Sequence, residues 1–394
     1  MEDYLIKLCE EAASKAVGWR RYIHEHPELS FKEVGTTAFI ERILRGFDGI
    51  AVERPLKTGL VAVLKGDLPG KTVAMRADID ALPISEDESL PIRSKVPGVM
   101  HACGHDAHAA TLLGTAEVLS KIRHTLHGTV KFIFQPAEEC PPGGAKDMVA
   151  CGVLNDVDMI FGMHYHVYED PGTFLVKPGP LYASTYDMRI ELSGKGGHAA
   201  FPHSGTDCIL LASQIVVGIN GIIPRFIDNA KRSVLTVTGI TSPMTYNSFP
   251  DSVTLIGTMR SLDKDAEALI IRKVTELCQS YARLFEASCS VTFTKGYDLV
   301  SSDPAIAAAV RKTLTEEFGE AHVKEPVPLM GGEDFSSYLA RVPGCFFRSG
   351  TRTVKSDGSV SPPHCSSYEF NDDAILPSVK AQVSVLLNVP GMIS

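Results

Sequence analysis

The sequence has no long apolar run and no long basic run. Its most apolar stretch, residues 209–224, is interrupted by polar residues at 213, 214 and 220, so it predicts a buried amphipathic helix and not a membrane span. Lysine and arginine are spread along a chain whose net charge is -9, which argues against a nucleic-acid-binding surface. These absences argue against a membrane protein and a nucleic-acid-binding protein, and a small-molecule partner remains the expectation.

No apolar signal segment follows the acidic start at residues 1–3, and no disulfide framework is evident. The nine cysteines are an odd number and are scattered without the regular spacing of a secreted domain. We therefore expect a cytoplasmic protein whose thiols are reduced. The 394 residues, 44% of them hydrophobic and 22% charged, are typical of a soluble chain with two domains.

The two ends of the chain predict one α/β domain. Short apolar runs predict buried strands at residues 60–64, 72–75, 130–134, 159–163 and 345–348. Helices are expected over residues 1–45, with a break at 26–28, and at 107–121 and 304–318. This alternation predicts a mostly parallel sheet covered by helices, formed by residues 1–183 and 298–394.

The middle of the chain, residues 184–297, predicts a separate inserted domain. Strands are expected at residues 185–192, 233–239, 252–260 and 288–293, and helices at 207–222 and 264–285. The order strand, helix, strand, strand, helix, strand is that of a ferredoxin-like α+β unit.

Four potential metal ligands lie within residues 101–108, directly before an expected helix. Cys103 and His105 are two residues apart, and Gly104 between them gives the loop room to fold back. This spacing is unusual for packing alone and predicts that Cys103 and His105 bind a metal ion. Cys103 as a thiolate nucleophile is the competing interpretation, although no Cys-His-Asn order supports it.

Two adjacent carboxylates, Glu138 and Glu139, follow an apolar strand. Such a pair usually means only solvated charge, but these residues stand where ligands bind in open α/β sheets. Neighbouring residues on irregular backbone point in different directions. One carboxylate can therefore bind metal while the other faces the attacking water.

Weaker candidates lie elsewhere in the chain. His164 and the pair Asp78 and Asp80 each follow an expected strand, and His364 lies in a rigid late turn with two prolines. A lone histidine in a loop is more often a surface residue, so each signal is weak by itself. Together these groups can converge on one edge of one sheet.

The chemistry of these side chains predicts a two-metal hydrolase. Cysteine, histidine and carboxylate ligands suit zinc, cobalt, nickel or manganese, whereas calcium and magnesium prefer oxygen ligands throughout. Two adjacent divalent ions can polarise an amide carbonyl and hold the hydroxide that attacks it. A carboxylate then carries the proton from water to the departing nitrogen.

Six motifs resemble one protein family, in the same order along the chain. They are HEHPELSF at 24–31, RADIDALP at 76–83, HACGHDAH at 101–108, QPAEE at 135–139, GGHAA at 196–200 and GEDF at 332–335. The chain resembles the aminoacylase/carboxypeptidase family of cocatalytic metallopeptidases. Within it, the chain is most similar to the branch of hippurate hydrolases, N-acyl-amino-acid amidohydrolases and plant auxin-conjugate hydrolases.

This resemblance implies an amidohydrolase that cleaves N-acyl amino acids with two metal ions, zinc, manganese, cobalt or nickel. It implies the general base Glu138 and five metal ligands, namely Cys103, His105, Glu139, His164 and His364. Many relatives have a histidine ligand where this chain has Asp78 and a bridging aspartate where it has Cys103, which leaves the native metals open. A dipeptidase or carboxypeptidase of the same family is the alternative enzyme.

The resemblance also implies that the inserted domain is a lid through which a homodimer forms. His198 would help to stabilise the oxyanion across the dimer, and Asn247 and Arg260 would hold the substrate carboxylate. A catalytically idle metal-binding or partner-binding protein is the alternative of another class. Idle relatives would be expected to lose the base or a ligand, and here both kinds of residue are present.

Overall fold

The computed structural model describes the whole chain except residues 1, 244, 356, 357 and 394. Contacts divide it into two compact units. Unit 1 comprises Met1–Gly179, Ser301–Val327 and Asp334–Ser394, and unit 2 comprises Pro180–Val300 and Pro328–Glu333. Each unit has its own hydrophobic core. None of the helices in the described part of the chain has the length and apolar character that a bilayer crossing requires.

Unit 1 contains an eight-stranded sheet. In spatial order its strands are β1 (Ile50–Glu53), β2 (Leu60–Lys65), β4 (His127–Gln135), β3 (Leu68–Asp78), β5 (Met159–His166), β16 (Gly344–Gly350), β6 (Phe174–Leu175) and β15 (Val323–Lys324). The four central strands, from β4 to β16, are parallel to one another. The pairings β1–β2, β2–β4 and β16–β6 are antiparallel, and β6 and β15 are parallel. Every residue of β16 is buried, as expected for a strand covered on both faces.

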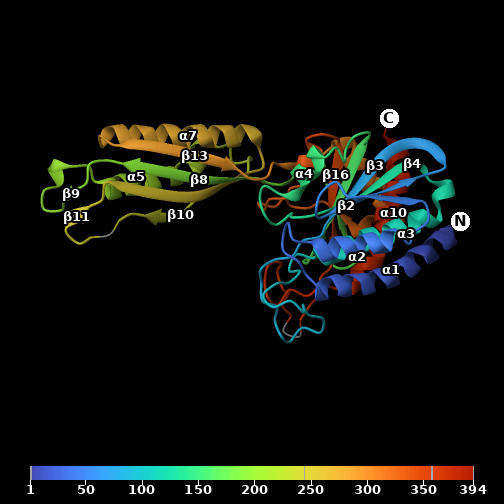
Figure 1. Cartoon of the computed structure of the whole chain (residues 1–394). Coiled ribbons are helices and arrows are strands. Elements are labelled where there is room, and N and C mark those ends of the chain that lie inside the picture. The colour runs from blue at the N-terminus through green and yellow to red at the C-terminus, as the bar shows by residue number, and fades with distance from the viewer. Residues whose placement is uncertain (1, 244, 356–357, 394) are drawn as a thin grey trace. The chain divides into compact units, whose positions relative to one another are not determined.

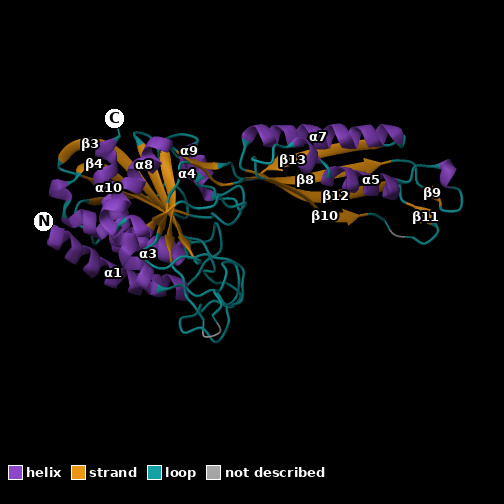
Figure 2. Ribbon diagram, turned by 180° about the vertical axis from the view of Figure 1, so that it is seen from behind, coloured by secondary structure: helices purple, strands orange, loops and turns teal. Residues whose placement is uncertain are grey.

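Helices cover this sheet (Figures 1 and 2). They are α1 (Glu2–Glu25), α2 (Val34–Leu44), α3 (His105–Lys121), α4 (Gly144–Ala150), α8 (Pro304–Phe318), α9 (Ser336–Leu339) and α10 (Ile375–Met392), with 3-10 turns η1 (Arg123–Thr125), η3 (Glu320–His322) and η4 (Asp372–Ala374). The helices α1, α3 and α10 pack against one another. The predicted α/β class with a mostly parallel central sheet is confirmed.

Unit 2 is an antiparallel sheet with helices on one face. Its sheet has the order β10 (Ser233–Thr241), β12 (Ser252–Ser261), β8 (Ser184–Ser193) and β13 (Ser288–Lys295). The helices are α5 (Cys208–Asn220), α6 (Ile222–Phe226) and α7 (Lys264–Leu284). Alternate residues of β8 are buried, because one face of the sheet packs on these helices. This element order and strand order are those of a ferredoxin-like unit.

Short elements complete unit 2 and its chain connections. The strands β9 (Gly197–His198) and β11 (Ser248–Phe249) form a small antiparallel pair beside η2 (Pro202–Ser204). The strands β7 (Gly179–Tyr182) and β14 (Val300–Ser302) pair with each other where the chain passes between the units.

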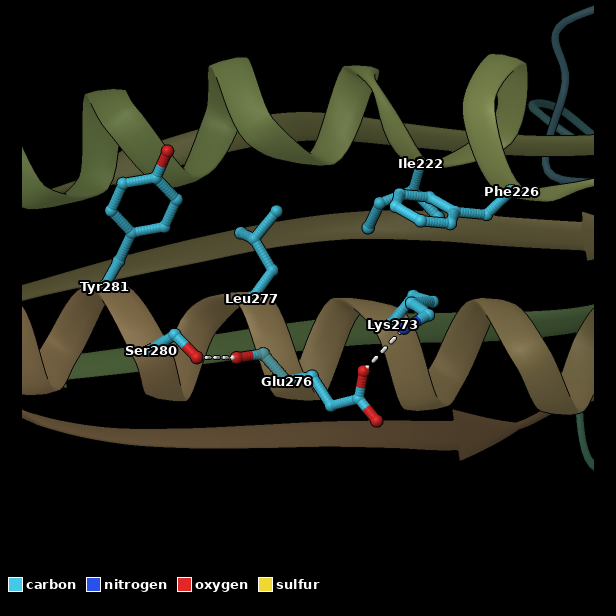
Figure 3. A pocket seen from close by; sticks show the side chains of 7 residues that line it. All are labelled: Ile222, Phe226, Lys273, Glu276, Leu277, Ser280 and Tyr281. Atoms are coloured by element: carbon cyan, nitrogen blue, oxygen red, sulfur yellow. Dashed lines mark hydrogen bonds and ion pairs between the residues drawn. The ribbon is translucent and has the colours of Figure 1, made fainter.

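An apolar groove of about 350 Å³ lies along α6 and α7 of unit 2 (Figure 3). Its lining includes Phe226, Leu277 and Tyr281. The two charged groups in it, Lys273 and Glu276, are paired with each other at 2.9 Å. The groove therefore offers shape and apolar surface but no group suited to amide hydrolysis.

Candidate metal centre

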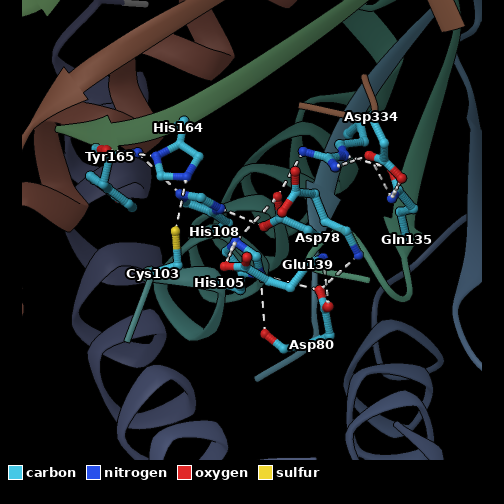
Figure 4. Close-up of polar contacts among 12 residues, drawn as sticks. Asp78, Asp80, Cys103, His105, His108, Gln135, Glu139, His164, Tyr165 and Asp334 are labelled. Atoms are coloured by element: carbon cyan, nitrogen blue, oxygen red, sulfur yellow. Dashed lines mark hydrogen bonds and ion pairs between the residues drawn. The ribbon is translucent and has the colours of Figure 1, made fainter. Parts of the chain in front are cut away.

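Neighbouring parallel strands bring polar side chains to one edge of the sheet in unit 1. The strand β3 ends at Asp78, which lies opposite Gln135 at the end of β4. The strand β5, which is parallel to β3, carries His164 near its own carboxyl end. Ligands bind at this edge in open α/β sheets. Figure 4 shows the side chains of these strand ends gathered around one place.

The first residue of α3, His105, and Cys103 in the loop before it add two more side chains to the same edge. The helix begins at His105, directly after Gly104, whose φ of 86° lies in the left-handed region that favours glycine. A Cβ atom at Gly104 would lie 2.8 Å from the hydroxyl oxygen of Tyr368. The turn therefore requires glycine between the two ligand candidates.

The five predicted ligands converge in two overlapping groups. The Sγ atom of Cys103 lies 3.5 Å from Nε2 of His164 and 3.3 Å from Nε2 of His364. The Oε1 atom of Glu139 lies 3.1 Å from Nε2 of His364 and 3.9 Å from Nε2 of His105. Ligand atoms lie within 4.8 Å of one another in the group Cys103, His105 and His164, and also in the group Cys103, Glu139 and His364. Cys103 belongs to both groups.

Hydrogen bonds orient the imidazoles of two of these histidines toward the centre. Nδ1 of His164 donates to the carbonyl of Tyr165 at 2.6 Å, and Nδ1 of His105 donates to the carbonyl of Asp80 at 3.0 Å. In the neutral form of each ring the proton is then on Nδ1, so Nε2 presents a lone pair. Nε2 of His105 is buried and has no hydrogen-bond partner among the described residues. This arrangement fits a divalent cation, because metal-binding histidines use their other ring nitrogen in this way.

Asp80 also positions the two adjacent glutamates. Its Oδ1 accepts the backbone amide of Glu138 at 3.1 Å, and its Oδ2 accepts the amide of Glu139 at 3.0 Å. The hydroxyl of Ser30 donates to Oδ2 at 2.7 Å. Carboxylate oxygens of Glu138 and Glu139 form a third compact group with His105. Both carboxylates therefore lie among the metal-ligand candidates, and Asp80 holds their backbone in place.

Two histidines of the segment 101–108 have a different environment from His105. Nδ1 of His108 donates to Asp78 at 2.5 Å, and its Nε2 accepts the amide of Tyr165 at 3.0 Å. Both nitrogens of His108 are thus used within the protein, and this side chain supports the neighbouring residues. His101 is buried, and neither of its nitrogens has a hydrogen-bond partner among the described residues.

A buried ion-pair network lies behind the centre. The guanidinium of Arg76 donates to Gln135 at 2.7 Å, to Asp78 at 2.7 Å and to Asp334 at 2.8 Å. The amide of Gln135 also donates to Asp334. A buried charge of either sign is costly unless it is paired and hydrogen-bonded. The network therefore compensates these carboxylates and fixes the ends of β3 and β4.

Negative charge is concentrated among the ligand candidates. The Cys103 thiol and the Glu139 carboxylate raise the pKa of His364 to about 10. Burial lowers the pKa of His105, but the Asp78 carboxylate and the hydrogen bond with Asp80 outweigh it and raise that pKa well above its ordinary value. Burial and Glu139 raise the pKa of the Cys103 thiol. The same negative field favours a bound cation.

The three candidates in unit 2 fall into two places. His198 and Asn247 lie together, because β9 pairs with β11 and the amide of Ala199 donates to the carbonyl of Asn247 at 2.9 Å. Arg260 lies on β12 opposite Thr185, at the start of β8. The ten residues of β8 span about 33 Å, and β9 and β11 lie beyond its other end (Figure 1). Within one copy of unit 2, Arg260 is therefore remote from His198 and Asn247.

Sequence reasoning did not single out Glu33 and gave Asp80 no role in holding the glutamates. Glu33 is buried and accepts the backbone amide of Ala137 at 2.8 Å. The motif at residues 24–31 marked this part of the chain, but the contact joins residues 104 positions apart. Only the tertiary structure brings them together.

Comparison with known proteins agrees with this fold and with a hydrolase. The model of peptidase family M20/M25/M40 matches residues 74–388. Thermostable carboxypeptidase 2 of Saccharolobus solfataricus is 39% identical over 379 residues, which cover 95% of this chain and 92% of that protein. The N-acyl-L-amino acid amidohydrolase of Geobacillus stearothermophilus is 39% identical over 296 residues, which cover 75% of this chain and 80% of that protein.

A solved structure gives the same result. The Bacillus subtilis YXEP protein, described as a dinuclear metal binding peptidase from the M20 family, has a TM-score of 0.87 and 33% identity, covering 98% of this chain and 99% of that one. The fold and the site thus define a hydrolase built around a metal centre. The chain belongs to peptidase family M20/M25/M40.

Proposed function

We propose that this protein is a metal-dependent amidohydrolase that cleaves the amide bond of N-acyl amino acids. One observation carries the proposal. The ligand atoms of Cys103, His105, Glu139, His164 and His364 gather in two groups that share Cys103, and the carboxylate of Glu138 lies beside them. Separate segments of the chain supply these residues, and a purely structural cluster has no need of this donor set.

Cys103, His105 and His164 would hold one divalent ion, and Cys103, Glu139 and His364 would hold the other. Sulfur, imidazole and carboxylate donors together suit zinc, manganese, cobalt or nickel. When bound, such a pair of ions supplies a Lewis acid for the amide carbonyl and lowers the pKa of water.

Glu138 would act as the general base. Its backbone is fixed by Asp80, its side chain is buried to 7% exposure, and its carboxylate lies within the group formed with His105 and Glu139. A carboxylate so placed can take a proton from the attacking water and deliver it to the leaving nitrogen. An amide needs this transfer, because its nitrogen is a poor leaving group unless it is protonated.

His198 would donate a hydrogen bond to the oxyanion. Its Nδ1 accepts the backbone amide of Ala200 at 3.1 Å, so the proton of the neutral ring is on Nε2. The side chain is exposed, which leaves this donor accessible. A donor of this kind acts when negative charge develops on the carbonyl oxygen.

The positions in unit 2 support a homodimer. One small substrate cannot reach both Arg260 and His198 of the same copy, because about 26 Å of β12 separates residue 252, near the β9–β11 pair, from Arg260. We propose that Arg260 binds the substrate carboxylate. A second copy would then supply His198 and Asn247. A symmetric dimer gives both sites the same complement of residues.

The relatives support the substrate class. One relative is named for N-acyl-L-amino acids, and an N-acetylcysteine deacetylase of Bacillus subtilis is 40% identical over 86% of this chain. A carboxypeptidase or dipeptidase activity is the second candidate. It is favoured by the relative named thermostable carboxypeptidase 2, which matches 95% of the chain.

The state of the cysteines supports a proposal for the cellular location of the protein. The nine cysteines, all among the described residues, are free. Free thiols on a globular chain are typical of a reducing compartment, and we propose the cytoplasm.

A substrate panel tests the proposed function. Purified protein, stripped with a chelator, is supplied separately with zinc, manganese, cobalt or nickel and assayed with hippurate, N-acetyl amino acids and dipeptides. A Glu138→Gln preparation controls for contaminating hydrolases. We expect the highest kcat/KM with an N-acyl amino acid. Preference for dipeptides would support the second candidate, and no hydrolysis with any of the metals would contradict both.

A further inference from the structure

The motif at residues 24–31 and the start of α2 have no part in the chemistry described above. Nevertheless this segment is joined to the loop that carries the two glutamates. Glu33 is fully buried, and its Oε1 accepts two backbone amides, that of Phe31 at 2.9 Å and that of Ala137 at 2.8 Å. Its Oε2 is buried and has no hydrogen-bond partner among the described residues.

Both residues that donate to Glu33 have unusual backbone conformations. Phe31 has a φ of 65° and Ala137 a φ of 54°, so both lie in the left-handed region, which a Cβ atom disfavours. Ala137 is fully buried and directly precedes Glu138. A non-glycine residue keeps such a conformation only when its surroundings determine it. The shared carboxylate oxygen of Glu33 is one such determinant.

Three successive backbone amides of this loop, at residues 137–139, donate hydrogen bonds to two buried carboxylates. Glu33 accepts the amide of Ala137, and Asp80 accepts the amides of Glu138 and Glu139. The left-handed residue turns the chain immediately before the pair. The direction in which each glutamate side chain leaves the backbone depends on that turn.

We propose that Glu33 is a positioning residue that holds Ala137 in the left-handed conformation. In this way Glu138 reaches the attacking water while Glu139 reaches the metal centre. The proposal rests on the proposed function for the roles of the two glutamates. Glu33 itself touches neither substrate nor metal and acts through the backbone of Ala137.

This role requires a hydrogen-bond acceptor at the right distance from the amide of Ala137. It does not require a negative charge. Glu33→Gln keeps an acceptor oxygen at the same distance from the backbone and removes the charge. Glu33→Asp keeps the charge but is shorter by one carbon–carbon bond, about 1.5 Å, so its oxygen no longer reaches Ala137. A role through long-range charge predicts the opposite order of activities for these two variants.

Glu28 offers a matched control in the same segment. Its carboxylate accepts the amides of Gly35 at 3.0 Å and Thr36 at 2.7 Å, at the start of α2. Both amides lie at the start of α2 and neither belongs to the loop of the two glutamates. Glu28→Asp therefore shortens a carboxylate that holds backbone amides in the same segment as Glu33 but holds none of the three amides at residues 137–139 that Glu33 and Asp80 accept.

The experiment compares the holoenzymes of wild type, Glu33→Gln, Glu33→Asp and Glu28→Asp. It measures kcat and KM for an N-acyl amino acid at full metal occupancy, and it measures cobalt affinity by titration followed through the visible absorption of the bound ion. We expect Glu33→Asp to lose ~10-fold to ~100-fold in kcat, because a displacement of about 1 Å at a reacting group can cost ~10²-fold. Its KM should change little and its cobalt binding should weaken, whereas Glu33→Gln and Glu28→Asp should resemble wild type.

Two outcomes would overturn the proposal. One is a Glu33→Asp enzyme with wild-type kcat and cobalt affinity. The other is a Glu33→Gln enzyme that is impaired while Glu33→Asp is not. Failure of the proposed function is a separate result, because it appears with the wild-type protein in the substrate panel. The cobalt titration needs no substrate and tests the position of Glu139 in either case.

Discussion

The Sγ atom of Cys103 lies 3.3 Å from Nε2 of His364, although 261 residues separate them in the sequence. His364 lies in the loop that follows β16 in the chain, and Cys103 precedes α3. A second imidazole, that of His164, lies 3.5 Å from the same sulfur. Cys103 has two interpretations, as a metal ligand and as a covalent nucleophile. Substitution of this thiol tests them most directly.

If Cys103 is shared by two metal ions, Cys103→Ala should lower metal occupancy, and excess metal should restore little activity. The measurement is metal content by atomic emission after gel filtration, together with turnover at increasing metal concentration. A covalent nucleophile predicts a different pattern. The variant would then keep its metals, and wild type would form an acyl-enzyme that mass spectrometry detects.

The two adjacent glutamates should fail in different ways. Glu138→Gln keeps the shape of the side chain but removes the proton acceptor, so metal content should stay near normal while kcat falls by ~10²-fold or more. Glu139→Gln removes a ligand charge and should lose metal. Metal content and kcat measured on the same samples distinguish the two. Substantial turnover in fully metallated Glu138→Gln would show that another group is the base.

His198→Ala should fold, bind metals and lose ~10²-fold to ~10³-fold in kcat, because it removes a donor to the oxyanion. The trans arrangement is tested by subunit exchange with Glu138→Gln. If His198 serves the partner's site, each heterodimer has one intact site and one site with both defects. About half of the wild-type activity per heterodimer should then return.

Two results of this exchange would contradict the arrangement. Demonstrated heterodimers without recovered activity would mean that His198 serves its own subunit or has no catalytic role. A protein that sedimentation velocity shows to be monomeric at assay concentration, yet fully active, would contradict the homodimer itself.

Glu33 should make the protein less stable as the pH rises. Burial raises the pKa of Glu33 from 4.5 to about 7. The folded protein therefore binds this proton more tightly than the unfolded chain, and the resulting stabilisation is present below pH 4.5 and lost as the pH rises through about 7. Since one pKa unit corresponds to about 1.4 kcal/mol, the loss is at most ~3.5 kcal/mol.

Glu33→Gln resembles the protonated carboxyl and should not show this loss. The free energy of unfolding in urea, measured for both proteins at about pH 4.5 and about pH 8, should shift in favour of the variant at the higher pH. Both measurements use metal-free protein, so that metal binding does not contribute. Parallel pH dependence of the two proteins would mean that the carboxyl of Glu33 titrates normally.

Local patterns in the sequence were sufficient for most of the secondary structure. The helix expected at residues 304–318 coincides with α8, because Asp303 accepts the amides of Ala305 and Ile306 and Pro304 occupies the first turn. The predicted apolar runs correspond to the strands β2, β3, β4, β5 and β16. The two-residue strands β6 and β15 were not expected, because two residues are too few to form a periodic pattern.

The sequence by itself also determined which side chains could take part in the chemistry. Cys103 and His105 stand out by their spacing around Gly104, and Glu138 and Glu139 by their place after a strand. These are local signals, since they depend on the type and order of neighbouring residues.

Only the tertiary structure decided how those side chains divide the work. His108 and His105 are three residues apart on one helix, yet His108 uses both ring nitrogens in hydrogen bonds with Asp78 and Tyr165, whereas Nε2 of His105 has no such partner among the described residues. The holding of Ala137 by Glu33 likewise depends on a contact across 104 residues. The physical reason is that ring-nitrogen protonation and backbone positioning depend on hydrogen-bond partners, and here those partners come from distant segments that meet only when the sheet has formed.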